Sequence, residues 1–197
     1  MPEARLSPLA DLGSVPEIGS LNVGLRVSEH RPLTLLHLQH ERQTPELRAA
    51  LASLDCTELP RPGFRVASGA SQLMCIGPSI YLLVEENGAE NAALRLDGGI
   101  GRAFSAAVDL RDAWTRLVIV GDKAADLLST GCVLDFHPRA FPPERCAATG
   151  MARMHVIVTR VKLQEFHLLI GRSYALSLWE WLSDAAAAVL AVAIRDQ

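Results

Sequence analysis

The spacing of apolar positions in the first regular part of the chain predicts a strand, a helix and further strands. Residues 33–38 form an apolar run typical of a strand, and Leu47, Leu51 and Leu54 recur at helical spacing behind Pro45, which suits a helix start. The expected elements are strand 33–38, helix 45–54, strands 64–67, 72–76 and 80–85, helix 88–96 and strand 104–110.

The second part of the chain repeats this order. We expect strand 115–120, helix 122–129, strands 156–161 and 166–170 and helix 173–191. The apolar strands 80–84 and 166–170 align with each other, which indicates a weak internal duplication. The predicted fold class is therefore α+β, with two ferredoxin-like β-α-β-β-α halves packed together, roughly residues 32–110 and 111–197. A single irregular α+β domain is the alternative.

The two ends of the chain have different patterns. Residues 1–31 contain prolines and glycines without a sustained period, so we expect an extended arm that lies on a partner, followed by one α+β domain over 32–197. In the last helix Ser173 is the expected cap, and Leu176, Trp179, Leu182 and Ala186 share one face. Trp181 lies off that face and contacts either a second side of the core or a partner.

Composition narrows the class of protein. The 197 residues are 49% hydrophobic with a formal net charge of -3, as in a soluble globular protein. Lysine and arginine are not clustered and aromatic residues make up 5%, which argues against a nucleic-acid partner. We expect no secretory signal, because residues 1–13 have no continuous apolar stretch, and no membrane span, because the apolar tail 185–194 is only ten residues long. The expected location is therefore the cytoplasm.

No catalytic, cofactor-binding or metal site is expected in this chain. Cys56, Cys75, Cys132 and Cys146 match no metal-ligand spacing, and His37 and His40 face opposite sides of a strand. A thiol enzyme would need Cys132 as nucleophile, and the closeness of Asp135 and His137 in sequence is weak support for that.

The segment 131–146 has the most distinctive composition. It reads G-C-V-L-D-F-H-P-R-A-F-P-P-E-R-C, with three prolines, two aromatic residues and two arginines. Such a loop is stiff and loses little entropy on docking, which suits a binding edge, although a fixed internal crossover is equally compatible. The candidate interface residues are His137, Arg139, Phe141 and, from the last helix, Trp181.

This segment also carries a resemblance to a known family. The run H-P-R-A-F-P-P at 137–143 and the run S-L-W-E-W-L at 177–182 resemble the gamma subunit of heterotetrameric sarcosine oxidase, and the resemblance covers most of residues 63–185. At 76–83 the chain also resembles that family, with Tyr81 where tryptophan is usual. More distantly, the chain is similar to the folate-binding aminomethyltransferase fold of the T-protein of glycine cleavage.

The resemblance implies an accessory, non-catalytic subunit of a four-subunit flavoenzyme with alpha, beta and delta partners. That family oxidatively demethylates sarcosine to glycine, forms hydrogen peroxide and passes the one-carbon unit to tetrahydrofolate. FAD, FMN, NAD and zinc are implied in the other subunits, and tetrahydrofolate in the alpha chain. The alternative is a stand-alone folate-binding one-carbon protein. The T-protein fold carries an acidic residue in a loop at the position where residues 150–154 of this chain run straight into His155.

Overall fold

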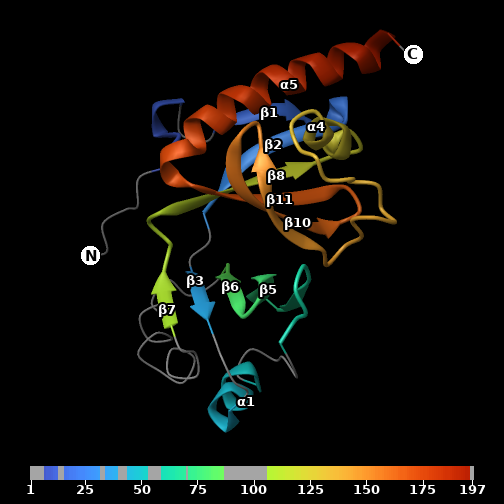
Figure 1. Cartoon of the computed structure of the whole chain (residues 1–197). Helices are drawn as coiled ribbons and strands as arrows, with labels where there is room; N and C mark the ends of the chain where they lie inside the picture. Colours follow the sequence, from blue (N-terminus) through green and yellow to red (C-terminus); the bar gives the residue numbers. More distant parts are fainter. Residues whose placement is uncertain are drawn as a thin grey trace. The chain divides into compact units, whose positions relative to one another are not determined.

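The computed structural model describes residues 7–12, 16–31, 34–39, 44–52, 59–69, 71–86 and 106–195 (Figure 1). The chain forms two compact units. The first consists of Met1–His30, Asp112–Pro143 and Ala148–Gln197, and the second of Arg31–Arg111 and Glu144–Ala147. The sequence pattern places the boundary between the two predicted halves at 110/111. In the structure the chain passes from the second unit to the first one residue later, between Arg111 and Asp112.

The first unit is built on a six-stranded sheet in the order β1-β2-β8-β11-β10-β9. Its strands are β1 (Glu17–Ser20), β2 (Leu25–His30), β8 (Trp114–Val120), β9 (Cys146–Met151), β10 (Met154–Lys162) and β11 (Glu165–Gly171). Three short 3-10 turns, η1 (Ala10–Leu12), η2 (Leu21–Val23) and η3 (Arg172–Tyr174), and two helices, α4 (Ala124–Ser129) and α5 (Ala175–Arg195), complete it.

The central strands β8, β10 and β11 of this sheet are buried along most of their length. In the antiparallel register Val27 lies opposite Ile119, and Leu117 lies opposite Leu168, and all four side chains are buried. Residues directly opposite each other share a face, so these positions form one apolar layer. Helices α4 and α5 lie against the sheet in Figure 1, and their apolar sides complete the core of the unit.

Helix α5 differs in two details from its expected form. It begins at Ala175, and Ser173 lies inside η3, so Ser173 does not cap it. Trp179, Leu182 and Ala186 are buried as predicted, but Leu176 is 40% exposed. The buried stripe runs through Ala175 and Leu178, which lie four residues before Trp179 and Leu182 respectively, and this turns Leu176 toward solvent.

The N-terminal segment differs from the extended arm predicted over residues 1–31. Strands β1 and β2 pair with each other, and β2 also pairs with β8 inside the sheet. Two glycines of this segment have φ in the left-handed region: Gly19 lies within β1 with φ of 69°, and Gly24 lies in the turn between η2 and β2 with φ of 78°. Leu25 and Val27 alone are too short a pattern to reveal a strand whose neighbour lies some 90 residues later.

The second unit has a five-stranded sheet in the order β4-β5-β6-β3-β7 and one described helix. Its elements are β3 (Thr34–Gln39), α1 (Pro45–Ala52), β4 (Arg65–Ser68), β5 (Ser71–Gly77), β6 (Ile80–Glu85) and β7 (Ala106–Asp109). Thr44 caps α1, because its hydroxyl accepts the Leu47 N–H at 3.2 Å. Leu47 and Leu51 then pack into a core with Leu36, Leu38, Leu73, Cys75, Tyr81 and Leu83.

Most predicted strands occur within one or two residues of their expected bounds. The helix predicted over 88–96 lies outside the described residues. Strand β9 was not predicted, because its sequence C-A-A-T-G-M contains small residues and no alternation of large apolar side chains. The coarse prediction of a mixed fold with antiparallel sheets and few helices is confirmed within the part of the chain that the structure describes.

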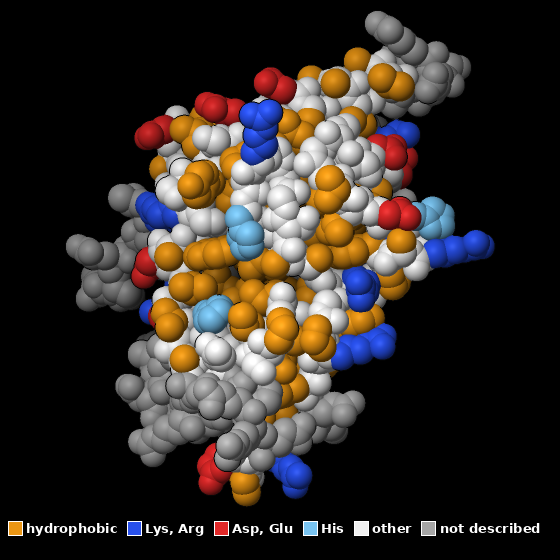
Figure 2. All heavy atoms as spheres, in the orientation of Figure 1, with side chains coloured by type: hydrophobic (Ala, Val, Ile, Leu, Met, Phe, Trp, Pro, Cys, Tyr) orange, Lys and Arg blue, Asp and Glu red, His pale blue; other side chains and the backbone are white. Residues whose placement is uncertain are grey.

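The C-terminal helical segment is more apolar than the tail 185–194 suggests. The stretch Arg172–Val192 has a mean hydropathy of 1.3 over its most apolar part, of which 28% is buried, so by length and composition it could cross a membrane. Figure 2 shows hydrophobic side chains on the outer part of α5. One such helix is weak evidence for a span, because a helix that packs on a sheet passes the same test, and α5 packs through Leu178 and Leu182.

Gly121 tests the packing of β2 against β8. A Cβ at this position, where φ is +132°, would lie 2.1 Å from the carbonyl oxygen of Gly24. We predict that Gly121→Ala lowers the free energy of unfolding by about 2 kcal/mol or more, through backbone strain and overpacking. In contrast, Gly150→Ala meets nothing within 4 Å and changes it by about 0.5 kcal/mol or less. Denaturant unfolding of both variants checks this, and equal stabilities would contradict it.

Candidate functional site

The loop 131–143, which joins α4 to the crossing before β9, is anchored by two aromatic rings. Phe136 and Phe141 are 2% and 3% exposed, and their ring centroids lie 5.6 Å apart in an edge-to-face arrangement. Phe136 also packs edge-to-face on Phe166 of β11 at 5.6 Å. The two loop aromatics therefore belong to the core of the first unit, and the prediction that Phe141 is an interface residue is corrected by its burial.

A buried arginine fixes the loop backbone. Arg160 of β10 is 2% exposed, and its Nη1 donates to the carbonyl oxygens of Phe136 at 3.1 Å and Phe141 at 2.6 Å. Nε and Nη2 donate to the carbonyl oxygen of Leu163 at 3.1 and 2.8 Å. Burial lowers the pKa of the Arg160 guanidinium, which also lies 4.6 Å from the ring centroid of Phe166. One side chain thus holds both ends of the loop tip and the β10–β11 turn.

Between these anchors the exposed tip has its own hydrogen bonds. The His137 N–H donates to Oδ1 of Asp135 at 2.8 Å, and the Arg139 N–H donates to Nδ1 of His137 at 3.2 Å. The N–H groups of Ala140 and Phe141 both donate to the His137 carbonyl oxygen at 2.9 Å. Because Nδ1 accepts a hydrogen bond, the neutral His137 ring carries its proton on Nε2.

The outer side of the loop combines charged and apolar side chains. His137, Pro138 and Arg139 are exposed, and Val133 is 96% exposed. Leu163, whose carbonyl binds Arg160, is 57% exposed on the adjacent turn. We call these exposed residues of the loop and of the adjacent turn, which Arg160 ties together through the backbone, the loop surface.

Trp181 lies at the base of the same loop. It is half-buried, and a Cβ on Gly131 would lie 2.4 Å from the Cη2 and Cζ2 atoms of its ring. The indole therefore packs directly on the backbone where the loop leaves α4. Of the four predicted interface residues, His137 and Arg139 lie on the outside of the loop, Trp181 at its base and Phe141 in the core.

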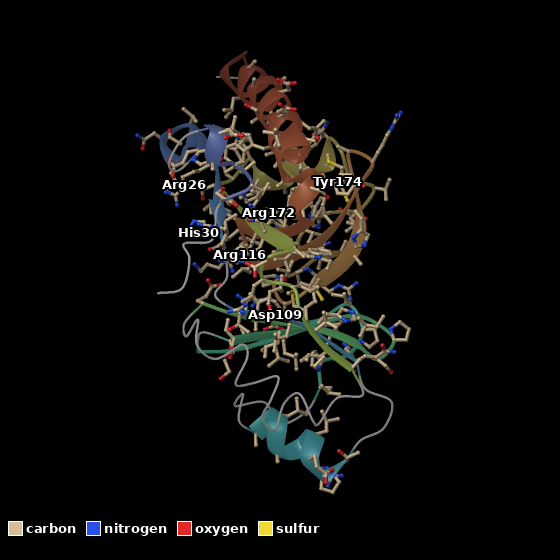
Figure 3. All side chains as sticks on the ribbon, turned by 90° about the vertical axis from the view of Figure 1, so that its left-hand side faces the viewer. Arg26, His30, Asp109, Arg116, Arg172 and Tyr174 are labelled. Carbon is tan, nitrogen blue, oxygen red and sulfur yellow. The ribbon has the colours of Figure 1, made fainter. Side chains whose placement is uncertain are left out.

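The first unit also contains a cluster of polar side chains that the sequence did not predict. Glu29 of β2 accepts hydrogen bonds from the hydroxyls of Thr115 at 2.6 Å and Ser7. On the same two strands His30 lies opposite Arg116 in the register, and Figure 3 labels both, with Arg26 and Arg172. An arginine inside the apolar run 115–120 is the one sequence signal that could have pointed to this group.

The cysteines and histidines form no reactive arrangement within the described part of the chain. The Cys132 thiol lies 3.7 Å from the Thr149 hydroxyl, not beside a histidine base. Burial raises the pKa of Cys75, and raises that of Cys146 to about 12, so both thiols stay protonated at neutral pH. No group of three or more metal-ligating side chains occurs among the residues that the structure describes, and His40 lies outside them.

The turn between β9 and β10 departs from the T-protein pattern. Ala152 and Arg153 have φ of 48° and 68°, so two residues in the left-handed region close the hairpin directly. This is the position at which the resemblance implies a longer loop with an acidic residue. The described turn has neither the length nor the carboxylate.

Comparison with known proteins decides the family. The sequence model described as the sarcosine oxidase, gamma subunit family matches residues 40–188. The chain belongs to this family. A curated sarcosine oxidase subunit gamma from an Arthrobacter species is 30% identical over 139 residues, which are 70% of this chain and 68% of that protein. The resemblance carried by 137–143 and 177–182 is thus confirmed.

Solved structures extend the similarity to the fold. A chain of the heterotetrameric sarcosine oxidase from Corynebacterium sp. U-96, in complex with pyrrole 2-carboxylate, matches with a TM-score of 0.82 and 24% identity, over 94% of this chain and 96% of that one. The glycine cleavage system aminomethyltransferase T from Bartonella henselae matches with a TM-score of 0.61 and 14% identity, over 91% of this chain and 57% of that one. The fold is therefore aminomethyltransferase-like.

Phe141 tests the division of the loop into anchor and surface. We predict that Phe141→Ala lowers the free energy of unfolding of the chain by about 3–5 kcal/mol, because it removes a buried ring from the contact with Phe136. Val133→Ala, on the exposed side of the same loop, changes it by about 0.5 kcal/mol or less. Urea unfolding of both variants measures this difference, and an unchanged stability of Phe141→Ala would show that the ring is not an anchor.

Proposed function

We propose that this chain is the gamma subunit of a heterotetrameric sarcosine oxidase, in which it supports assembly and carries no active site of its own. The observation that carries the proposal is the family match over residues 40–188. The structural match to a chain of a heterotetrameric relative, over nearly the full length of both chains, supports it. This is an association of several subunits, of which we take the others to be alpha, beta and delta chains.

The reaction of the whole complex then follows from the family. It oxidatively demethylates sarcosine to glycine, transfers the one-carbon unit to tetrahydrofolate and reduces dioxygen to hydrogen peroxide. FAD, FMN, NAD, tetrahydrofolate and zinc belong to the partner subunits in this proposal. We place the complex in the cytoplasm.

Polar side chains around the loop bond mainly to backbone atoms, which supports a structural role for this chain. The buried guanidinium of Arg160 on β10 donates hydrogen bonds to three backbone carbonyl oxygens. Asp135 binds a backbone N–H, and the Cys132 thiol faces a hydroxyl. These contacts stabilise a loop, and none of them positions a nucleophile beside a base.

The loop surface is our candidate for contact with another subunit. We assign His137, Arg139 and Trp181 to this interface and leave Phe141 out because it is buried. A stiff, internally bonded loop loses little conformational entropy on association. The exposed charged groups and the exposed Val133 side chain on such a loop suit contact with another protein better than contact with water alone.

We also propose that both units are ferredoxin-like halves. In the second unit the order along the chain is β3, α1, β4, β5 and β6, with β6 between β3 and β5 in the sheet. In the first unit the order is β8, α4, β9, β10 and β11, with β11 between β8 and β10. Both match the split β-α-β arrangement and support the internal duplication.

A stand-alone folate-binding protein is the second candidate. The similarity to aminomethyltransferase T, with a TM-score of 0.61, favours it. The direct β9–β10 hairpin through Ala152 and Arg153 argues against it, because that position has no acidic residue.

A purification from the native host tests the proposal. The tagged chain is isolated gently, and the co-eluting polypeptides and the visible absorption spectrum are recorded. We expect three further chains and a flavin spectrum. A colourless single chain would overturn the accessory role, and quenching of its fluorescence by tetrahydrofolate would then favour the folate-binding alternative.

A further inference from the structure

We propose that the loop tip is a preorganised receptor for one carboxylate of a neighbouring subunit, with the Arg139 guanidinium and the Nε2–H of His137 as donors. The inference rests on the proposed function, since the carboxylate comes from another chain of the complex. The family assignment does not say which chemical group this surface binds, and the proposal names that group.

The tip is held in place before any partner binds. Arg160 binds the carbonyl oxygens of Phe136 and Phe141, the residues that flank residues 137–140. Pro138, Pro142 and Pro143 fix three φ angles in the same stretch. A partner therefore meets side chains whose backbone is already ordered, which lowers the entropic cost of association.

Both outward groups are hydrogen-bond donors. The His137 ring uses Nδ1 to accept the Arg139 N–H, so its remaining polar atom is the Nε2–H. Arg139 is exposed, and within the part of the chain that the structure describes its guanidinium forms no ion pair. The neighbouring acid, Asp135, directs Oδ1 to the His137 N–H. Two exposed donors on neighbouring positions of one ordered loop suit an anion as their partner.

The backbone of the tip favours a carboxylate over a phosphate. Phosphate sites usually use several free backbone N–H groups of a loop or helix end. Here the N–H groups of His137, Arg139, Ala140 and Phe141 are all bonded within the loop. One arginine fork and one imidazole Nε2–H match a planar monoanion, which a guanidinium binds through two parallel hydrogen bonds.

The surroundings favour a protein surface as the source of the carboxylate. Val133 is 96% and Leu163 57% exposed on the segments that Arg160 joins. An interface places apolar contacts around a few charged anchors, and burial of the apolar part strengthens the charged pair. An aspartate or glutamate within an apolar patch of the partner fits this surface.

Competition during assembly tests the proposal. Wild-type chain and a variant, with different tags, are co-expressed with the partner subunits, and their ratio in the purified complex is measured. We expect Arg139→Gln to enter the complex at about one-tenth of the wild-type level or less. Arg48→Gln, which removes the same charge from an exposed position of α1, is the matched control and should enter at the wild-type level.

Three further variants define the chemistry. Arg139→Glu should be excluded more strongly than Arg139→Gln, because it faces the carboxylate with a like charge, and Arg139→Lys should recover part of the assembly. His137→Phe, which keeps a ring but has no Nε2–H donor, should lower incorporation at least about threefold. Thermal unfolding of each variant chain establishes that it is folded.

The outcomes separate this proposal from the proposed function. Equal incorporation of Arg139→Gln and Arg48→Gln, in a complex that forms normally, overturns the carboxylate receptor and leaves the subunit assignment intact. Equal losses in Arg139→Gln and Arg139→Glu, with no recovery in Arg139→Lys, overturn it as well, since packing of the stem would then explain the effect. Failure of the wild-type chain to enter any complex overturns the proposed function itself.

Discussion

The bonds from the buried Arg160 guanidinium to three backbone carbonyls are the interaction on which the loop and its surface depend. A guanidinium stays charged when buried and can only donate, so it must be surrounded by acceptors. Phe136, Phe141 and Leu163 supply them at 2.6–3.1 Å. Each of these carbonyls, left without a donor inside the protein, would cost about 1–3 kcal/mol. The loop has its conformation because this conformation satisfies the arginine.

This constraint divides the string H-P-R-A-F-P-P into two roles. Phe141 points into the core against Phe136, and the residues that begin the string lie outside. His137 bonds to Asp135 and Arg139 through backbone and ring atoms, so the exposed part is ordered by its own contacts. A single short motif therefore supplies both a buried anchor of the first unit and its exposed loop surface.

The sequence predicted the strands with a strong apolar pattern and missed the features that need distant partners. Residues 115–120 and 166–170 are found as β8 and β11 because their apolar runs are continuous. Strand β2 was missed because its pattern is short and its neighbour β8 lies far along the chain. Arg160 was missed because its acceptors come from separate parts of the loop and from the β10–β11 turn. Residues 137–139 of the motif are exposed, but Phe141 is buried against Phe136, which in turn packs on Phe166 of β11, and no local pattern shows these contacts.

Hydrogen exchange at the loop amides tests the central role of Arg160 most directly. The Arg160→Met variant keeps an apolar stem and loses every donor. The amides of Arg139, Ala140 and Phe141, which bond within the loop, should then exchange at least about tenfold faster, because the loop loses its fixed ends. The amides of β8 and β11 should keep their protection and so establish that the variant is folded. Unchanged protection at the three loop amides in a folded variant would contradict the view that Arg160 fixes the loop.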